Sequence, residues 1–248
     1  MIKKILKGAA ILLLWLLIWQ AAAMIINDIF LIPTPLETLK ALFVLGQTGQ
    51  FYLAVLKSLL RIILGFTLGV LVGFLGGVAA DKFSLFNDIT SPAIQVIKAV
   101  PVASFIILAF FWFKSDELPI FIAFLMVLPM VWSATLSALS GIDKKYIEMA
   151  RVYKLSTARI FFKIKMPFIT PTLLTTCLTA LGFAWKSGIA AEIICRPQMA
   201  LGTLLNDHKN YFDMPSVFAL TVVVAVLSII LEIVLKQAVR RVLNDKHQ

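Results

Sequence analysis

The segment Asp143-Lys-Lys-Tyr-Ile-Glu-Met-Ala-Arg-Val-Tyr-Lys-Leu-Ser-Thr-Ala-Arg-Ile-Phe-Phe-Lys-Ile-Lys-Met-Pro167 differs from the rest of the chain, because it carries two acidic and seven basic residues between long apolar runs. Apolar residues such as Ile147 and Ala150 are interleaved with the charges. Asp143 and Ser156 are of the types that cap helix N-termini. The segment therefore predicts two short amphipathic helices joined by a turn. Such a surface suits docking on another protein or contact with anionic lipid, and the pattern alone favours neither.

The flanking sequence is far more apolar than a soluble domain. The chain has 248 residues and is 60% hydrophobic, whereas soluble domains are about 45–50% apolar. The runs 11–26 and 217–231 carry no charge, and a run of about 18 apolar residues is long enough to cross a bilayer. Strict apolar/polar alternation is absent, so a barrel is not expected. The sequence therefore predicts an all-α, polytopic membrane protein.

Six membrane spans are expected, in one transmembrane domain over 1–248 with a connecting loop at about 141–166. They cover residues 9–28, 53–80, 88–112, 118–140, 166–190 and 215–237. Lys98 and Pro101 interrupt the third span, which is expected to be broken or tilted. The basic N-terminus resembles a signal peptide, but no clear small-residue cleavage site follows it, so a retained first helix is expected.

The distribution of Lys and Arg predicts the orientation. With the N-terminus inside, fourteen of these residues fall in cytoplasmic segments and four in outer segments (Lys40, Lys114, Arg196 and Lys209). Both termini and the 141–166 loop are therefore expected on the cytoplasmic side. Lys57 and Arg61, at the outer end of the second span, do not fit this pattern. The net charge of +10 thus follows membrane topology and does not indicate nucleic-acid binding.

Four glycines follow one another at four-residue spacing in the second span: Gly65, Gly69, Gly73 and Gly77. They lie on nearly one helix face, a pattern that lets two membrane helices approach closely. This face is either a seam along the translocation core or ordinary close packing.

The loop resembles the "EAA" loop of permease subunits in binding-protein-dependent ABC importers. Glu148-Met149-Ala150, then Lys154, then Ile164-Lys165-Met166-Pro167 stand at the spacing of the family pattern Glu-Ala-Ala, three residues, Gly, nine residues, Ile-x-Leu-Pro. Met149, Lys154 and Met166 depart from it. Lys154 is the largest departure, because lysine adopts a left-handed turn less readily than glycine. A different turn, or a helix that runs on, are the alternatives there.

Further segments are similar to the nitrate, sulfonate and taurine branch of this family. They are Leu31–Leu39, Ser58–Gly69, Ser91-Pro92 with Val100-Pro101, Phe183–Lys186, and Ala191-Glu192. The resemblance implies a type I importer permease with a methionine-importer-like fold. It implies import of a small solute, such as nitrate, a sulfonate, taurine or bicarbonate. A vitamin precursor or another small organic solute is the alternative within this class, and a secondary transporter or membrane scaffold is the alternative outside it.

The resemblance also implies the partners: an ATPase dimer, a second permease copy (most simply a homodimer), an extracytoplasmic binding protein and the lipid of the inner membrane. A coupling helix from Glu148 to Leu155 would dock on the ATPase, and Pro167 would fix the turn into the fifth span. The residues expected at this contact are Glu148, Met149, Ala150, Arg151, Tyr153, Lys154, Leu155, Ser156 and Pro167. ATP and magnesium are expected on the ATPase, because this chain has no phosphate-loop motif.

No catalytic constellation or metal-ligand cluster is found in the sequence, so enzymatic chemistry is not expected. Charged residues inside spans are candidates for a translocation path. The candidates are Lys98, Pro101, Trp185, Lys186 and Glu192, which would either line a path for an anion or anchor the chain at the interface. Lys186 and Glu192 are six residues apart and are not expected to pair within one helix.

Overall fold

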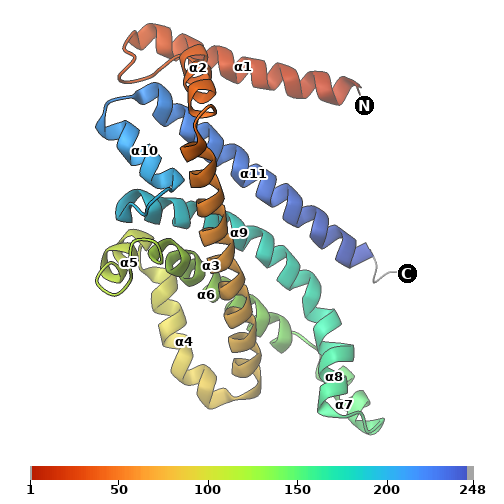
Figure 1. The fold of residues 1–248 in the computed structure, drawn as a ribbon. Coiled ribbons are helices and arrows are strands. Elements are labelled where there is room, and N and C mark those ends of the chain that lie inside the picture. Colours follow the sequence, from red (N-terminus) through yellow and green to blue (C-terminus); the bar gives the residue numbers. More distant parts are fainter. Residues whose placement is uncertain (1, 245–248) are drawn as a thin grey trace.

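A computed structural model describes residues 2–244 (Figure 1). This part of the chain is all-helical, as predicted. Its elements are α1 (Ile2–Ile26), α2 (Pro35–Leu45), α3 (Gly49–Lys82), α4 (Ser84–Ala99), α5 (Val102–Ala109), α6 (Leu118–Ser140), α7 (Lys144–Val152), α8 (Thr157–Ile160), the π-helical turn η1 (Phe161–Lys165), α9 (Met166–Cys195), α10 (Leu201–Asn210) and α11 (Met214–Asn244).

Within residues 2–244, five helical stretches are long and apolar enough to cross a membrane. They are Leu6–Ile26, Gly49–Lys82, Leu118–Ser140, Thr157–Cys195 and Met214–Arg241. The predicted third span is a broken pair, because α4 and α5 meet at an angle of 105°. Val100 is extended there (ψ 133°), since the ring of Pro101 disfavours helical geometry in the residue before it.

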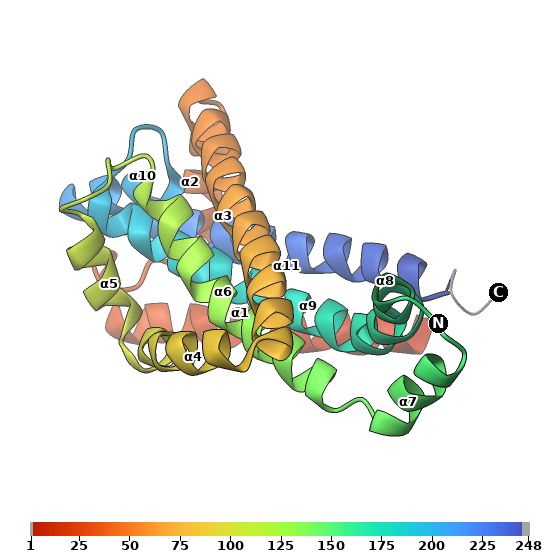
Figure 2. The same cartoon turned by 90° about the horizontal axis from the view of Figure 1, so that it is seen from below.

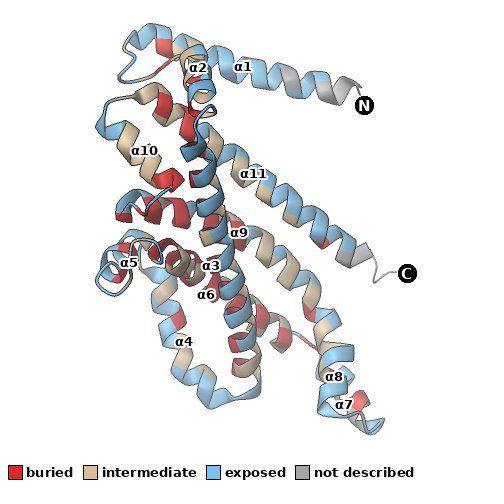
Figure 3. Ribbon diagram, viewed as in Figure 1, coloured by how far each residue is buried: buried red, intermediate tan, exposed pale blue. Residues whose placement is uncertain are grey.

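The core of the bundle lies where α3, α6 and α9 cross. Figure 3 shows buried residues concentrated at this crossing, while α1 is exposed along most of its length. Ile62, Val127 and Ala184, one from each of these helices, are 0% exposed and belong to one apolar cluster. Exposed apolar surface on the outer helices is the side that lipid can cover.

Glycine makes the contact between α3 and α6 close. A Cβ atom on Gly65 would lie 2.3 Å from the backbone oxygen of Ile120, and one on Gly69 would lie 2.7 Å from the Cβ of Val127. Gly73 and Gly77 face the same helix. The spacing therefore marks a helix pair whose backbones approach too closely for any side chain.

Two helices, α2 and α10, are absent from the expected six spans because they are too short to cross a bilayer. The start of α2 nevertheless carries a local sequence signal. The Thr34 side chain accepts a hydrogen bond from the Glu37 N–H, and Glu37 Oε2 accepts one from the Thr34 N–H (2.8 Å). The Thr34 N–H and the Thr34 Oγ1 both donate to the Glu37 carboxylate, and these two hydrogen bonds hold the pKa of Glu37 below its usual value. Reciprocal capping of this kind, with Pro35 in the first turn, is a start signal readable from sequence.

The bundle has two distinct ends. In Figures 1 and 2, α7 and α8 lie at one end and α10 at the other. The first turns of α1 and the last turns of α11 point toward the side of α7 and α8. We call these the α7 end and the α10 end.

Candidate functional site

The helix α7 ends in a left-handed turn at Lys154. Lys154 has φ 52°, and the Leu155 N–H donates to the Ala150 oxygen at 3.0 Å, five residues back. A residue in the left-handed conformation commonly follows a helix end in this way. The expected helix from Glu148 to Leu155 is therefore wrong in its bounds: α7 covers Lys144–Val152, and Leu155 lies beyond the turn. Lysine adopts the geometry that glycine would adopt more cheaply.

The exposed surface of α7 is both apolar and charged. In α7, Tyr146, Met149 and Val152 are 55%, 52% and 80% exposed, and Glu148 is exposed among them. Tyr153, directly after the helix, is 74% exposed. On the opposite face, Ala150 is 1% exposed, and Ile147 packs against a small apolar cluster that includes Leu139 of α6 and Ile169 of α9. The side chain of Arg151 lies outside the described part of the chain. The helix is thus anchored on one face and unpartnered on the other.

The expected turn at Pro167 is not found, because α8, η1 and α9 follow one another as continuous helical structure. Ser156 caps α8 as predicted, accepting a hydrogen bond from the Arg159 N–H. The Met166 N–H donates to the Phe161 oxygen, five residues back. This wider turn directly precedes Pro167, which has no N–H to continue the regular ladder. A π-helical turn thus replaces the expected break.

A cleft of about 440 Å³ lies between the last turns of α3 and the segment formed by α7, α8 and η1. It lies among Val78 and Asp81 of α3, Ile147 of α7, and Phe161 and Lys165 of η1. The Lys165 Nζ atom forms an ion pair with Asp81 Oδ2 at 2.7 Å. This ion pair is the polar connection between η1 and the last turn of α3.

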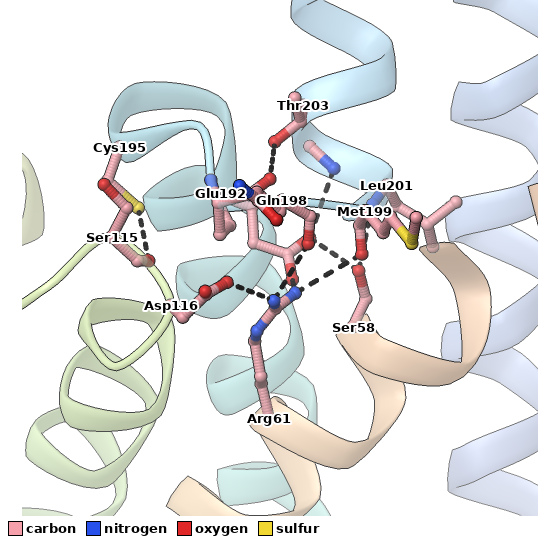
Figure 4. Close-up of polar contacts among 12 residues, drawn as sticks. Ser58, Arg61, Ser115, Asp116, Glu192, Cys195, Gln198, Met199, Leu201 and Thr203 are labelled. Carbon is pink, nitrogen blue, oxygen red and sulfur yellow. Dashed lines mark hydrogen bonds and ion pairs between the residues drawn. The ribbon is translucent and has the colours of Figure 1, made fainter. Parts of the chain in front are cut away.

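A polar cluster centred on Arg61 lies at the α10 end (Figure 4). Arg61 forms an ion pair with Asp116, from the turn between α5 and α6. Its Nη2 donates to the Gln198 oxygen at 3.0 Å, and its Nη1 donates to the Met199 oxygen at 3.5 Å. One guanidinium therefore joins α3 to two turns that are distant in sequence.

The carboxyl group of Glu192 lies at the base of this cluster and is 0% exposed. Its Oε2 accepts hydrogen bonds from Ser58 Oγ at 2.7 Å and from the Gly202 N–H at 3.1 Å. Ser58 Oγ also accepts from the Leu201 N–H at 2.9 Å. Burial of a carboxyl group is tolerated where it is hydrogen-bonded, so this network fixes the start of α10 against α3 and α9.

The expected path residues separate into two groups. Trp185 is 1% exposed and donates to the Val224 oxygen of α11 at 3.0 Å, so it packs inside the bundle together with the buried Glu192. Lys98, Pro101 and Lys186 are exposed, and Lys98 donates a hydrogen bond to Ser133 Oγ of α6. Only the second group presents side chains that a passing solute could touch.

Lys186 lies on a polar face of α9 that also carries exposed threonines. This face was not predicted from the sequence. Thr172, Thr175, Thr179 and Lys186 are exposed, and their spacing of three, four and seven residues places them along one face of the helix. Thr175 Oγ1 donates to the Thr172 oxygen at 2.9 Å, which lowers the cost of a hydroxyl at membrane depth. Helical spacing of threonines within the run was the available signal.

The sequence signal for the Arg61 cluster was also present. Arg61 was a cation inside a span that did not fit the orientation pattern, and ionisable residues in spans mark functional or structural centres. Its partners were not predictable, because Asp116 lies 55 residues away along the chain and Glu192 belongs to a different helix, α9. Residues 2–244 contain no cluster of His, Cys, Asp and Glu with metal-binding geometry.

Residues 65–244 match the family model described as "Binding-protein-dependent transport system inner membrane component". The chain belongs to this family. It is a multi-pass inner-membrane permease subunit of an ABC importer.

Two relatives are permeases of the branch that the sequence resembles. The putative aliphatic sulfonates transport permease protein of Bacillus subtilis (strain 168) is 27% identical over 228 residues, covering 89% of this chain and 80% of that protein. The taurine transport system permease protein of Escherichia coli (strain K12) is 27% identical over 240 residues, covering 94% and 86%. The predicted family and branch are confirmed.

Solved structures confirm the fold of this permease. The MetNI methionine ABC transporter, in inward-facing conformations, aligns with a TM-score of 0.60 at 16% identity, covering 77% of this chain and 93% of that one. A bacterial ABC transporter involved in the import of the acidic polysaccharide alginate aligns with a TM-score of 0.67 at 16% identity, covering 97% of each chain. The predicted type I importer architecture is therefore correct.

Proposed function

We propose that this permease works with a separate ATPase that docks on α7 and the turn after it. The supporting observation is the unpartnered surface of α7, where Met149, Val152 and Tyr153 are exposed beside Glu148. These residues stand in the segment that resembles the family's coupling loop. Exposed apolar groups ringed by charge are typical of protein contacts, which favours docking over lipid contact. ATP and magnesium belong to the ATPase in this proposal.

Transport then follows from movement of the docked element. Closure of the ATPase dimer on ATP draws α7 and α8 of two permease copies together, and this changes the bundle between two packed arrangements. The second copy, most simply an identical chain, completes the pathway. The exposed Thr172, Thr175 and Thr179 support this arrangement, because polar groups at membrane depth face a water-filled path or protein.

The proposed orientation places the α7 end and both termini in the cytoplasm. The excess of Lys and Arg in the segments at that end supports it. A binding protein then delivers the solute to the α10 end, where the turns around Arg61 lie.

The proposed homodimer has its own test. Cross-linking that captured only pairs with a different permease would contradict it.

The proposed solute is a small anion of the nitrate, sulfonate, taurine or bicarbonate class. The names of the relatives support it, together with two exposed cations in the helices of the pathway, Lys98 and Lys186. A cation that is exposed to a path attracts an anion over several ångströms. A vitamin precursor or other small organic solute is the second candidate within the same importer class.

The first experiment is isolation of the chain in mild detergent, with mass spectrometry of the proteins that accompany it. We expect a cytoplasmic ATPase, and we expect its loss when residues 148–155 are scrambled. A matched control is Tyr211→Ala at the α10 end, where the side chain is 82% exposed. This change should leave the ATPase bound.

Recovery of the chain alone, in every detergent and nucleotide condition, would overturn the proposal. It would favour the alternative of a different class, a secondary transporter or membrane scaffold that works without an ATPase. A secondary transporter would also need ion-coupling groups at the membrane midplane.

A further inference from the structure

Arg61 holds two turns of the α10 end with one side chain. Its Nη2 contacts both the Asp116 carboxylate and the Gln198 oxygen, and its Nη1 contacts the Met199 oxygen. Asp116 belongs to the turn between α5 and α6, and the two carbonyls belong to the turn between α9 and α10 (Figure 4). This guanidinium therefore joins the two turns directly.

A second carboxylate lies just beyond hydrogen-bond distance of the same guanidinium. Glu192 Oε1 is 3.7 Å from Arg61 Nη1, and it is buried with no hydrogen-bond donor in the structure. Ser58 and Gly202 use only the other oxygen. Since an arginine–carboxylate hydrogen bond spans about 2.8 Å, a movement of roughly 1 Å would give this orphaned oxygen its donor.

The two carboxylates differ in how firmly they are held. The Asp116 side chain is 59% exposed on a turn, whereas the Glu192 side chain is 0% exposed on a core helix. If the two turns move apart, the Asp116 carboxylate is therefore the one that loses contact with Arg61. The Glu192 carboxylate remains beside Arg61.

The α9–α10 turn, which Arg61 contacts, also contains two residues in an unfavourable backbone conformation. Arg196 and Met199 have φ values of 51° and 49°, in the left-handed region that residues other than glycine adopt at a cost. The contacts from Arg61 to Gln198 and Met199 help to hold this conformation. Withdrawal of the guanidinium would release the turn.

We propose that Arg61 is a positioning residue with two stations in the transport cycle. At the first station, seen here, it joins the α5–α6 turn to the α9–α10 turn through Asp116. At the second station it withdraws to the free oxygen of Glu192, and the two turns separate. This inference rests on the proposed function, because ATP binding supplies the energy that changes one station for the other.

Paramagnetic distance measurement on the complete complex tests the proposal without knowledge of the solute. Spin labels go on Lys114→Cys, an exposed position in the α5–α6 turn, and on Lys209→Cys, an exposed position in the last turn of α10. Both go into a background in which Cys177 and Cys195 are replaced by serine. The complex with its ATPase is measured in nanodiscs, without nucleotide and with ATP plus vanadate. The wild-type complex should show two label-to-label distances, one for joined turns and one for separated turns. The ratio of their populations should change with nucleotide.

The decisive result is the direction in which each of two substitutions changes the population of separated turns. Asp116→Asn removes the first station and should raise the population of separated turns, whereas Glu192→Gln removes the second station and should lower it. For Asp116→Asn the ratio should change roughly fivefold, the size of one partly exposed arginine–carboxylate pair. Glutamine keeps an acceptor for Ser58 and Gly202, so the network at the base is retained. The control Glu117→Gln alters the neighbouring exposed carboxylate and should change nothing.

Asp116→Asn is on the surface and carries the test alone if Glu192→Gln does not fold, and Asp116→Glu should restore the wild-type ratio. Equal effects of Asp116→Asn and Glu117→Gln, or shifts of the same sign for Asp116→Asn and Glu192→Gln, would overturn the two-station proposal. That outcome would leave the proposed function intact if an ATPase is bound and nucleotide still changes the distance. Absence of any ATPase would overturn the proposed function, and the two-station proposal with it.

Discussion

Lys165 Nζ lies 2.7 Å from Asp81 Oδ2, so an ion pair connects η1 to the last turn of α3. The two side chains are 26% and 17% exposed, which shields the pair partly from solvent. It crosses a cleft whose walls are otherwise largely apolar. In the proposed transport cycle, movement of the α7–α8 element would therefore reach α3 through a charged contact as well as through packing.

Loss of this ion pair should weaken the transmission of movement. In Lys165→Met the ATPase should still copurify, but the nucleotide-dependent change in the Lys114–Lys209 label distance should fall severalfold. A partly buried pair contributes about 1 kcal/mol. Lys163→Met, an exposed neighbour in the same turn, is the matched control. The double swap Asp81→Lys with Lys165→Asp should restore part of the change, and failure of both the loss and the rescue would contradict this role.

Glu148→Arg should uncouple the permease from its ATPase while leaving the protein in the membrane. Glu148 is exposed on α7, so its replacement does not disturb packing but reverses the charge in the middle of the proposed contact. The measurements are membrane abundance, ATPase copurification and uptake. Normal uptake by a stably expressed variant would count against docking at this surface.

Lys154→Gly should stabilise the turn after α7, because glycine adopts φ 52° without steric cost. We expect a gain of about 0.5–1 kcal/mol in the free energy of unfolding, with the ATPase still bound. Lys154→Val should lose stability, since a β-branched residue is poorly tolerated there. Chemical denaturation of the purified chain measures both variants, and equal stability of the two would show that the left-handed turn is absent.

Gly65→Ala should separate α3 from α6 and destabilise the protein by about 1–3 kcal/mol, the usual cost of overpacking. The new methyl group would meet the Ile120 carbonyl oxygen at 2.3 Å, and a backbone atom cannot rotate away. Gly182→Ala on α9 is the matched control, because nothing lies within 4 Å of its added Cβ. Thermal unfolding should show a lower midpoint for the first variant only.

The cap of α2 should depend on pH through Glu37. Its pKa is lowered from 4.5 by hydrogen bonds from Thr34, so the folded state favours the carboxylate. The stabilisation is therefore present above the unfolded pKa and is lost as pH falls through the folded pKa. Thermal unfolding monitored between pH 6 and pH 3 (about the titration range of Glu) should show this loss, and Glu37→Gln should reduce the pH dependence. An unchanged profile in the variant would contradict the assignment.

The helical class, the spans and the α7–α8 element could be predicted from the sequence. These features depend on local properties: apolar runs long enough for a bilayer, capping residues such as Ser156, and glycines at four-residue spacing. The bounds of α7 were missed because Lys154 occupies a conformation that its side chain disfavours, and the surrounding hydrogen bonds outweigh that local preference. The continuous helix through Pro167 was not predicted, because a π-helical turn directly before the proline lets the helix continue without an N–H at that position.

The Arg61 cluster was decided by tertiary structure alone. Arg61, Asp116 and Glu192 are separated by 55 and 76 residues along the chain, and nothing local indicates that they meet. They meet because the glycine face of α3 packs so closely on α6, and α9 crosses both. The order of residues was enough to show that charged side chains lie inside the membrane spans. Only the packing of three helices decided which charges lie together, since the cost of burying an ionisable group is offset by partners that folding brings from elsewhere in the chain.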